Sequence, residues 1–193
     1  MLVFREHINE AELIIWRMDE TLEELLEMSQ HHYDHEIENI SNDVRKKERI
    51  ISRFLLETLV GRKVEVKYAD SGKPFCDGMH FSISHTKNFV AVIVSNEPVG
   101  VDIEYKSDRI FRITEKFMHP DELKTLSECS EKQKFALICW CAKETVYKII
   151  QENGVDFAEM NCKIDSENIF LSYKSAHFTL KFLDFPDFFV VFS

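Results

Sequence analysis

The chain has 193 residues, of which 45% are hydrophobic and 30% are charged, and its formal net charge is −10. This composition is ordinary for a globular protein of one large domain or two small ones. The negative charge argues against nucleic-acid binding through the overall field, and an anionic ligand would need a local basic cluster or a metal ion.

Signals for membrane insertion or secretion are not visible in the sequence. No uncharged apolar stretch is long enough for a transmembrane helix, and residues 1–20 carry charges within their apolar parts without a small-residue cleavage site. The cysteines are five in number and form no CxxC pair, so we expect reduced thiols. These observations predict a cytoplasmic protein.

The first half of the chain contains both helical and β-type patterns. Its long helix is predicted to begin after Asn42 or Asp43, which can cap a helix N-terminus, and to end at Gly61. A turn is predicted over 70–75, and two β-rich runs separated by two residues predict a hairpin. The predicted strands are residues 11–18, 64–69, 80–86, 89–96 and 99–105, and the predicted helices are residues 19–30 and 42–61.

The second half is first helical and then rich in β-type residues. Pro120 suits the first turn of a helix. Because strands and helices do not alternate strictly, the fold class is predicted to be α+β, with a division near residues 96–100. The predicted helices are residues 112–118, 119–127 and 131–151, and the predicted strands are residues 161–165, 168–175, 177–184 and 187–193.

Two acids lie one residue apart in the predicted strand over 99–105. Asp102 and Glu104 therefore project to the same side of that strand. Two carboxylates at this separation repel each other, which raises the pKa of one of them unless a cation intervenes. They are either solvated acids at the end of a strand or a pair of oxygen ligands for a hard divalent cation such as Mg²⁺.

Within the predicted helix over 131–151, residues 135–150 are apolar nearly all round but are interrupted by three charged residues, Lys143, Glu144 and Lys148. Glu144 and Lys148 are four residues apart and share a face of the helix. They could form a surface ion pair of little energetic value. Because the helix is otherwise apolar, we expect these charges to enter a cleft, where Glu144 would be a third carboxylate beside the two strand acids.

The long helix of the first half has a basic ridge in which Arg45, Arg49 and Arg53 follow each other at four-residue intervals. Like charges at this spacing are mildly destabilising. The ridge could be a solvated face that Glu48 and Glu57 neutralise. It could also bind phosphate groups, for which guanidinium groups are well suited.

The first half of the chain contains further polar residues that could belong to a site. Lys73 lies in the predicted turn, and Ser84 and His85 end a predicted strand, although a single histidine is more often structural. The run HHYDH at residues 31–35 could imitate a metal site, but no further ligands are in view in its polar surroundings.

Four blocks of this sequence resemble the signature blocks of the Sfp-type 4′-phosphopantetheinyl transferases. GVDIE followed by WxxKExxxK at this distance is highly specific, whereas GKP alone is a weak signal. The region before Arg45 matches little. The blocks are GKPF at 72–75, FSISHT at 81–86, GVDIE at 100–104 and WCAKETVYK at 140–148, and KFMHPDEL at 116–123 is similar to a further family stretch.

The resemblance implies a fold of two pseudosymmetric halves, each with a small, mainly antiparallel sheet and helices, divided as 1–98 and 99–193. The first half would contact the phosphates of coenzyme A, and the second would carry the metal-binding acids and the catalytic helix. Coenzyme A and Mg²⁺ would lie in the cleft between the halves. It implies a monomeric enzyme that uses Mg²⁺, or Mn²⁺ as an alternative. This enzyme would transfer the 4′-phosphopantetheine arm of coenzyme A to a serine of an apo acyl or peptidyl carrier protein and release adenosine 3′,5′-bisphosphate.

The resemblance also implies roles for individual residues. Asp102, Glu104 and Glu144 would bind the metal, Glu144 would be the base for the carrier serine, and Lys148 would steady the pyrophosphate or the leaving group. Residues 109–118 would form a mainly apolar docking patch for the carrier. A non-catalytic coenzyme A-binding module and a metal-dependent pyrophosphate hydrolase are the alternatives. The expected coenzyme A contacts are Arg53, Lys73, Ser84 and His85, with His85 at the 3′-phosphate, and more loosely Arg45 and Arg49.

Overall fold

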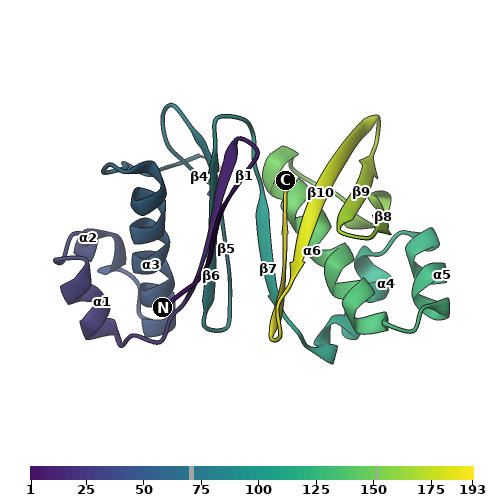
Figure 1. Cartoon of the computed structure of the whole chain (residues 1–193), viewed down its shortest axis with the longest axis horizontal. Coiled ribbons are helices and arrows are strands. Elements are labelled where there is room, and N and C mark those ends of the chain that lie inside the picture. The colour runs from purple at the N-terminus through teal and green to yellow at the C-terminus, as the bar shows by residue number, and fades with distance from the viewer. Residues whose placement is uncertain (70–71, 151) are drawn as a thin grey trace. The chain divides into compact units, whose positions relative to one another are not determined.

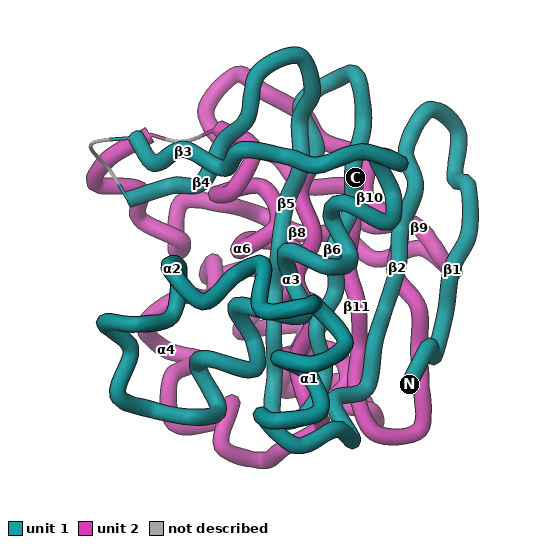
Figure 2. Tube along the Cα trace, turned by 90° about the vertical axis from the view of Figure 1, so that its left-hand side faces the viewer, with its two compact units in different colours: residues 1–99 teal, residues 100–193 magenta. Residues whose placement is uncertain are grey.

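The computed structural model of the chain describes residues 1–69, 72–150 and 152–193. It divides into unit 1, Met1–Val99, and unit 2, Gly100–Ser193, which Figure 2 shows in two colours. Two residues of the predicted turn, 70 and 71, and the last residue of the predicted helix over 131–151 lie outside the described residues. Within the described ranges, no helix has the length and apolar character needed to cross a membrane.

Unit 1 has a four-stranded antiparallel sheet in the order β1-β2-β6-β5. Every residue of β6 up to Val94 is buried, as are the first five of β2, which explains their apolar sequences. The predicted hairpin is confirmed, since Lys87 and Asn88 join β5 to β6. The bounds are β1 Leu2–Ile8, β2 Ala11–Arg17, β5 His80–Thr86 and β6 Phe89–Ser95.

The long helix of unit 1, α3, begins and ends where its capping residues predict. Asn42 caps α3 by accepting a hydrogen bond from the N–H of Arg45 at 3.1 Å, and Gly61 ends it with a φ of 71°. Helix α3 packs against the sheet in Figure 1 and contributes Ile51 and Leu55 to the core of this unit. The predicted strand over 64–69 is reduced to two residues. The bounds are α1 Leu22–Met28, α2 Asp34–Ile37, α3 Asp43–Val60, β3 Lys67–Tyr68 and β4 Pro74–Phe75.

Unit 2 has a five-stranded antiparallel sheet in the order β7-β11-β10-β9-β8. The last strand of the chain pairs with the first strand of this unit, so that Val191 lies opposite Asp102 and Phe189 opposite Glu104. All five strands of this sheet were predicted. Their bounds are β7 Val101–Tyr105, β8 Asn161–Asp165, β9 Asn168–Tyr173, β10 Ala176–Asp184 and β11 Phe188–Phe192.

Helix α6 is the central helix of unit 2 and packs on its sheet (Figure 1). The helix predicted over 112–118 is confirmed for Thr114–Phe117 but is shorter than predicted, because Arg112 belongs to a preceding 3₁₀ turn. All five cysteines are free thiols, as predicted. The bounds are η1 Asp108–Arg112, α4 Thr114–Phe117, α5 Pro120–Glu128, α6 Lys132–Ile150 and η2 Phe157–Glu159.

Candidate functional site

The acids of β7 face α6 within unit 2. Residues directly opposite each other in an antiparallel ladder share a face of the sheet, and Phe189 and Val191 belong to the core that α6 also lines. Their partners Glu104 and Asp102 therefore lie on the helix-facing side. The sheet thus presents both predicted metal ligands to the helix that carries the third.

Three residues of α6 form a stripe that meets these acids. Trp140, Glu144 and Lys148 follow each other at four-residue intervals and so share a face of the helix. The Lys148 ammonium donates to Asp102 Oδ1 at 2.8 Å and to the Val101 carbonyl oxygen at 2.9 Å. The Trp140 indole N–H donates to Glu104 Oε1 at 3.0 Å. Each strand acid is therefore bonded by a residue of α6, and Glu144 lies between these two residues in the stripe.

A close approach of backbones fixes the distance between β7 and α6. A β-carbon added at Gly100 would lie 2.4 Å from the carbonyl oxygen of Thr145. The Thr145 hydroxyl donates to the Val191 carbonyl oxygen at 3.1 Å, and the Gly100 N–H donates to the Ser193 hydroxyl at 3.0 Å. The start of β7 and the end of β11 are thus held against the helical turn that carries Glu144.

The carboxylates of this site are buried and repel each other. Burial, followed by the charge of Asp102, raises the pKa of Glu104 from 4.5 to about 7, against the opposing effects of the Trp140 hydrogen bond and of Lys148. Burial and Asp102 also raise the pKa of Glu144, and Lys148 opposes this. Three carboxylates and one ammonium leave two formal negative charges uncompensated. Oxygen donors with this charge deficit fit a hard divalent cation such as Mg²⁺.

Lys143, the next charged residue of α6, belongs to a different arrangement. It is fully buried, and its ammonium donates to Glu122 Oε2 at 2.6 Å and to the carbonyl oxygens of Phe117 at 2.8 Å and Phe157 at 3.0 Å. Glu122 also accepts from the N–H of Cys162 at 2.7 Å. This pair could not be predicted from sequence spacing, because its two partners are 21 residues apart and lie on different helices.

Ligand-type atoms of Glu122, Cys139 and Cys162 lie within 4.8 Å of one another, which is a spacing compatible with a metal ion. The charge of Glu122 is already balanced by Lys143, and its oxygens accept from the N–H groups of Cys162 and His119. Burial raises the pKa of the Cys139 thiol well above its ordinary value. The buried ion pair between Glu122 and Lys143, which lies beside two cysteine side chains, accounts for this cluster.

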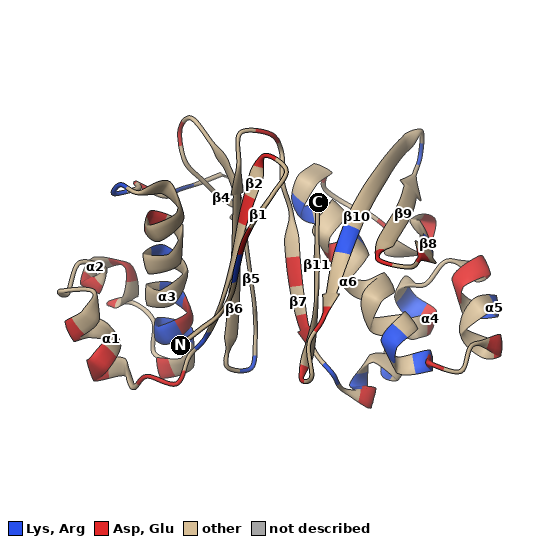
Figure 3. Cartoon of the chain, in the orientation of Figure 1, with Lys and Arg blue, Asp and Glu red and all other residues tan. Residues whose placement is uncertain are grey.

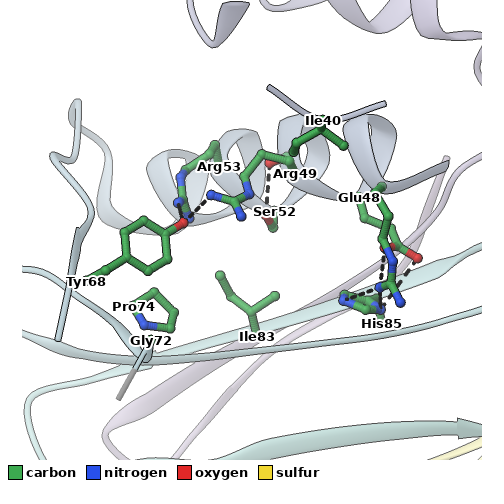
Figure 4. Close-up of a pocket in the computed structure, with 11 residues that line it drawn as sticks. Ile40, Glu48, Arg49, Ser52, Arg53, Tyr68, Gly72, Pro74, Ile83 and His85 are labelled. Carbon is green, nitrogen blue, oxygen red and sulfur yellow. Dashed lines mark hydrogen bonds and ion pairs between the residues drawn. The ribbon is translucent and has the colours of Figure 1, made fainter. Parts of the chain in front are cut away.

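Unit 1 contains a basic cavity of about 330 Å³ between α3 and the strands beside it (Figure 4). The predicted ridge residues Arg45, Arg49 and Arg53 line it together with His85. Figure 3 shows the Lys and Arg residues of α3 in blue. The other lining residues are Ile40, Glu48, Ser52, Tyr68, Gly72, Pro74 and Ile83.

The ridge is partly neutralised, but by a different acid from the one expected. Arg45 lies 2.8 Å from Glu48 Oε2, as the solvated-face alternative predicts. Arg53 donates to Glu36 Oε2 at 2.7 Å, and Arg49 lies 3.6 Å from the same atom. Glu57, which was expected to neutralise this ridge, instead accepts from the Tyr33 hydroxyl and from Lys63. These two partners lie outside the ridge, one before α2 and one after the end of α3, so the Glu57 carboxylate does not neutralise the ridge arginines.

Tyr68 links two arginines of the cavity wall. Its hydroxyl accepts from Arg53 Nη2 at 2.6 Å and also from Arg49, and both guanidinium groups lie within 6 Å of the ring centroid, at 5.5 and 5.9 Å. Arg53 is only 2% exposed, whereas the side chain of Arg45 is 60% exposed. Arg45 contacts the His85 ring at 3.3 Å at the open side. Tyr68 was missed in the sequence, where only its place next to the predicted turn pointed to it.

Two of the residues expected to contact coenzyme A are not brought to this cavity. Ser84 is buried and adjacent to His85 in β5, so it projects from the opposite face of the strand. Ile83 and His85, which share the other face, line the cavity. Lys73 is half-buried, and its flanking residues Gly72 and Pro74 line the cavity instead.

Two predicted features remain, the run at 31–35 and the segment 109–118. In the run at 31–35, His31 pairs with Asp34 at 3.1 Å and His32 lies 3.9 Å from Glu57. Among the residues that the structure describes, this run forms no cluster of metal-ligating atoms. Phe111 is 41% exposed in η1, and the docking role of residues 109–118 stays a prediction.

Comparison with known proteins identifies relatives of this chain. Residues 98–186 match the family model described as the 4′-phosphopantetheinyl transferase superfamily. The chain is 34% identical over 109 residues to the 4′-phosphopantetheinyl transferase gsp of Aneurinibacillus migulanus, across 53% of this chain and 46% of that protein. It is 30% identical over 82 residues to a 4′-phosphopantetheinyl transferase of Bacillus subtilis, across 40% and 37%. It is 33% identical over 84 residues to the transferase psf-1 of Bacillus pumilus, across 41% and 36%. The matches span less than half the length of these relatives.

Proposed function

We propose that this chain, whose residues 98–186 match the family model of the 4′-phosphopantetheinyl transferase superfamily, transfers the phosphopantetheine arm of coenzyme A to a serine of an apo acyl or peptidyl carrier protein. The observation that carries this proposal is the cluster of Asp102, Glu104 and Glu144 beside Lys148, which lies in the matched segment.

The reaction is a phosphoryl transfer. The serine oxygen would attack the pyrophosphate phosphorus that bears the pantetheine arm, and a phosphoester bond to the carrier would form. The bond to the bridging pyrophosphate oxygen would break, and adenosine 3′,5′-bisphosphate would leave with the electron pair. Glu144 would accept the serine proton, directly or through a water, and burial raises its pKa, which makes it a stronger proton acceptor than an ordinary carboxylate.

The three carboxylates would hold a divalent cation, Mg²⁺ or Mn²⁺, because their oxygen atoms and charge deficit fit such an ion. When bound, this cation would neutralise charge on the pyrophosphate. Lys148 already lies at this site through its bond to Asp102 and would add its ammonium charge beside the leaving group. The chain's net charge of −10 makes such local positive charge necessary for binding coenzyme A.

The basic cavity of unit 1 would bind phosphate groups of coenzyme A. Arg45 and His85 line this cavity with exposed side chains. We assign the direct contacts with the phosphate groups to these two residues. Arg53 is too deeply buried to reach a ligand freely, and it would act through Tyr68 and Glu36, which it holds in place. The contacts of Lys73 and Ser84 stay predictions from the family resemblance. A cytoplasmic, monomeric enzyme fits the five free thiols and remains part of this proposal.

The test is intact-mass spectrometry of an apo carrier protein incubated with this chain, coenzyme A and Mg²⁺. We expect the carrier to gain one phosphopantetheine group. The Glu144→Gln variant should slow this gain about 10²–10⁴-fold, the usual effect of losing a general base. Glu128→Gln is the matched control, because Glu128 is exposed at the end of α5.

The two alternatives give different products in the same experiment. A pyrophosphate hydrolase would release free phosphopantetheine in samples that lack the carrier. A non-catalytic module would bind coenzyme A but leave it and the carrier unchanged. If no acyl or peptidyl carrier gains mass while coenzyme A stays intact, the transferase proposal is wrong for this chain.

A further inference from the structure

Trp140 is the residue of the acid site that the reaction does not use. It is half-buried on the α6 stripe, and its indole N–H donates to Glu104 Oε1 at 3.0 Å. The ring is fixed on two sides: the ring centroid of Phe117 lies 5.0 Å away at an interplanar angle of 76°, and that of Phe157 lies 5.6 Å away at 51°. The direction of the N–H is thus set by packing.

We propose that Trp140 is a positioning residue that orients the Glu104 carboxylate for cation binding. The indole holds Oε1, so that Oε2 is the oxygen presented to the cation. This inference rests on the proposed function only for the presence of a divalent cation at these acids, and it does not depend on which substrate is modified.

The chemistry of the donor explains why an indole suits this position. A tryptophan N–H donates one hydrogen bond and carries no charge. It restrains the carboxylate without neutralising it and without repelling a cation. Asp102, by contrast, is held by the positively charged Lys148. A second ammonium at Glu104 would remove the charge deficit that attracts a divalent ion, whereas the indole preserves it.

The expected energetic effect follows from side-chain freedom. Glu104 has three rotatable side-chain bonds, and ordering a glutamate side chain costs up to about 2 kcal/mol. A partner that orders the carboxylate before the cation arrives removes part of this cost from binding. Residues that orient metal ligands in this way typically contribute about 10–100-fold to metal affinity.

The experiment measures the affinity for Mn²⁺ alone by electron paramagnetic resonance, which reports free Mn²⁺. Trp140→Phe keeps an aromatic ring but removes the N–H, and we expect it to weaken Mn²⁺ binding about 10–100-fold. Trp16→Phe is the matched control. The Trp16 indole donates to the Glu20 carboxylate at 3.3 Å in unit 1, so its loss should leave Mn²⁺ affinity unchanged.

A double-mutant cycle separates positioning from a general structural effect. If Trp140 acts through Glu104, the Trp140→Phe change should have no further effect on Mn²⁺ affinity once Glu104 is replaced by Gln. Equal losses in both backgrounds would mean that Trp140 acts otherwise, and the inference would be wrong. Thermal unfolding of each variant checks that it is folded.

A second readout comes from the Trp16→Phe variant, in which Trp140 is the one remaining tryptophan of the sequence. Bound Mn²⁺ should quench its fluorescence with the same affinity as the resonance titration reports. If the wild-type chain binds Mn²⁺ and Trp140→Phe binds it equally well, the inference fails while the proposed function stands. If the wild-type chain binds no Mn²⁺, the cation site itself is wrong and both proposals fail.

Discussion

Two lysines of helix α6, Lys143 and Lys148, are five residues apart, and their surroundings differ in exposure and, above all, in the balance of charge. The Lys143 ammonium is fully buried, donates to one carboxylate and two carbonyl oxygens, and faces the single acid Glu122. The Lys148 side chain is 23% exposed, and its partner Asp102 acts electrostatically on Glu104 and Glu144 as well. Both are ion pairs between this helix and a neighbouring element.

The comparison shows that burial alone does not distinguish a structural ion pair from a binding site. The Lys143 pair is neutral and its polar atoms are hydrogen-bonded, so it joins α5, α6 and η2 without needing a ligand. The acid site has two more negative charges than positive ones, and the raised pKa values of Glu104 and Glu144 express the cost. A deficit of this kind is typical of functional sites.

The largest predicted effect concerns the neutral pair. Lys143→Met should lower the free energy of unfolding by about 3–5 kcal/mol, because it leaves the buried Glu122 carboxylate without its cation. Urea denaturation measures this loss, with Lys132→Met at the exposed start of α6 as the control. Adding Glu122→Leu to Lys143→Met should restore part of the stability. A single variant as stable as the control would show that the pair does not hold the fold.

The second prediction concerns pH and the acid site. The pKa of Glu104 is raised to about 7 in the folded chain from an ordinary value of 4.5, so the folded state binds more protons than the unfolded state between these values. Stability should therefore fall by about 2–3 kcal/mol as pH rises from about 4.5 to 7, and this contribution should not change above that. Glu104→Gln should remove this part of the pH dependence, as comparison of urea midpoints across this range would test. An unchanged pH slope in the variant would contradict the assignment.

The smallest predicted effect is on Lys148. Lys148→Met should lower the free energy of unfolding by about 1–2 kcal/mol, less than Lys143→Met, because the acids it leaves can share protons and remain partly hydrated. Added Mg²⁺ should restore this stability by supplying the missing positive charge. Mg²⁺ should restore nothing in Lys143→Met, since that pair is closed to solvent. Equal responses of the two variants to Mg²⁺ would remove the distinction between the two regions.

Local signals in the sequence were sufficient for most of the fold. Asn42 and Gly61 fixed the ends of α3 because capping depends on residues close together in the chain. Strand β1 was missed because it forms the edge of its sheet, and its Arg5, Glu6 and His7 are exposed and give no apolar alternation. The helix predicted over 112–118 is shorter in the structure because its first residue belongs to the 3₁₀ turn that ends at Arg112, and the apolar spacing is compatible with both kinds of turn.

The sequence predicted those residues of the candidate site that share a motif with regular spacing, but not their hydrogen-bond partners. The spacing of Asp102 and Glu104 and that of Glu144 and Lys148 each place two residues on one face, and the structure brings these faces together. The partners of those residues depend on tertiary packing. Trp140 lies 36 residues from Glu104 in sequence, and no periodicity links the two. The pairing of Arg53 with Glu36 was not predicted for the same reason, since it also depends on tertiary packing.

Gly100 has a consequence for any attempt to redesign this chain. The position requires glycine for space and not for flexibility, because a β-carbon on the strand would collide with the Thr145 carbonyl oxygen. Even alanine would force β7 away from α6, and with it the carboxylates from Glu144. A saturation library at position 100, selected for Mn²⁺ affinity, should therefore return glycine alone. The smallest residue of the motif thus sets the dimensions of the site that its larger neighbours form.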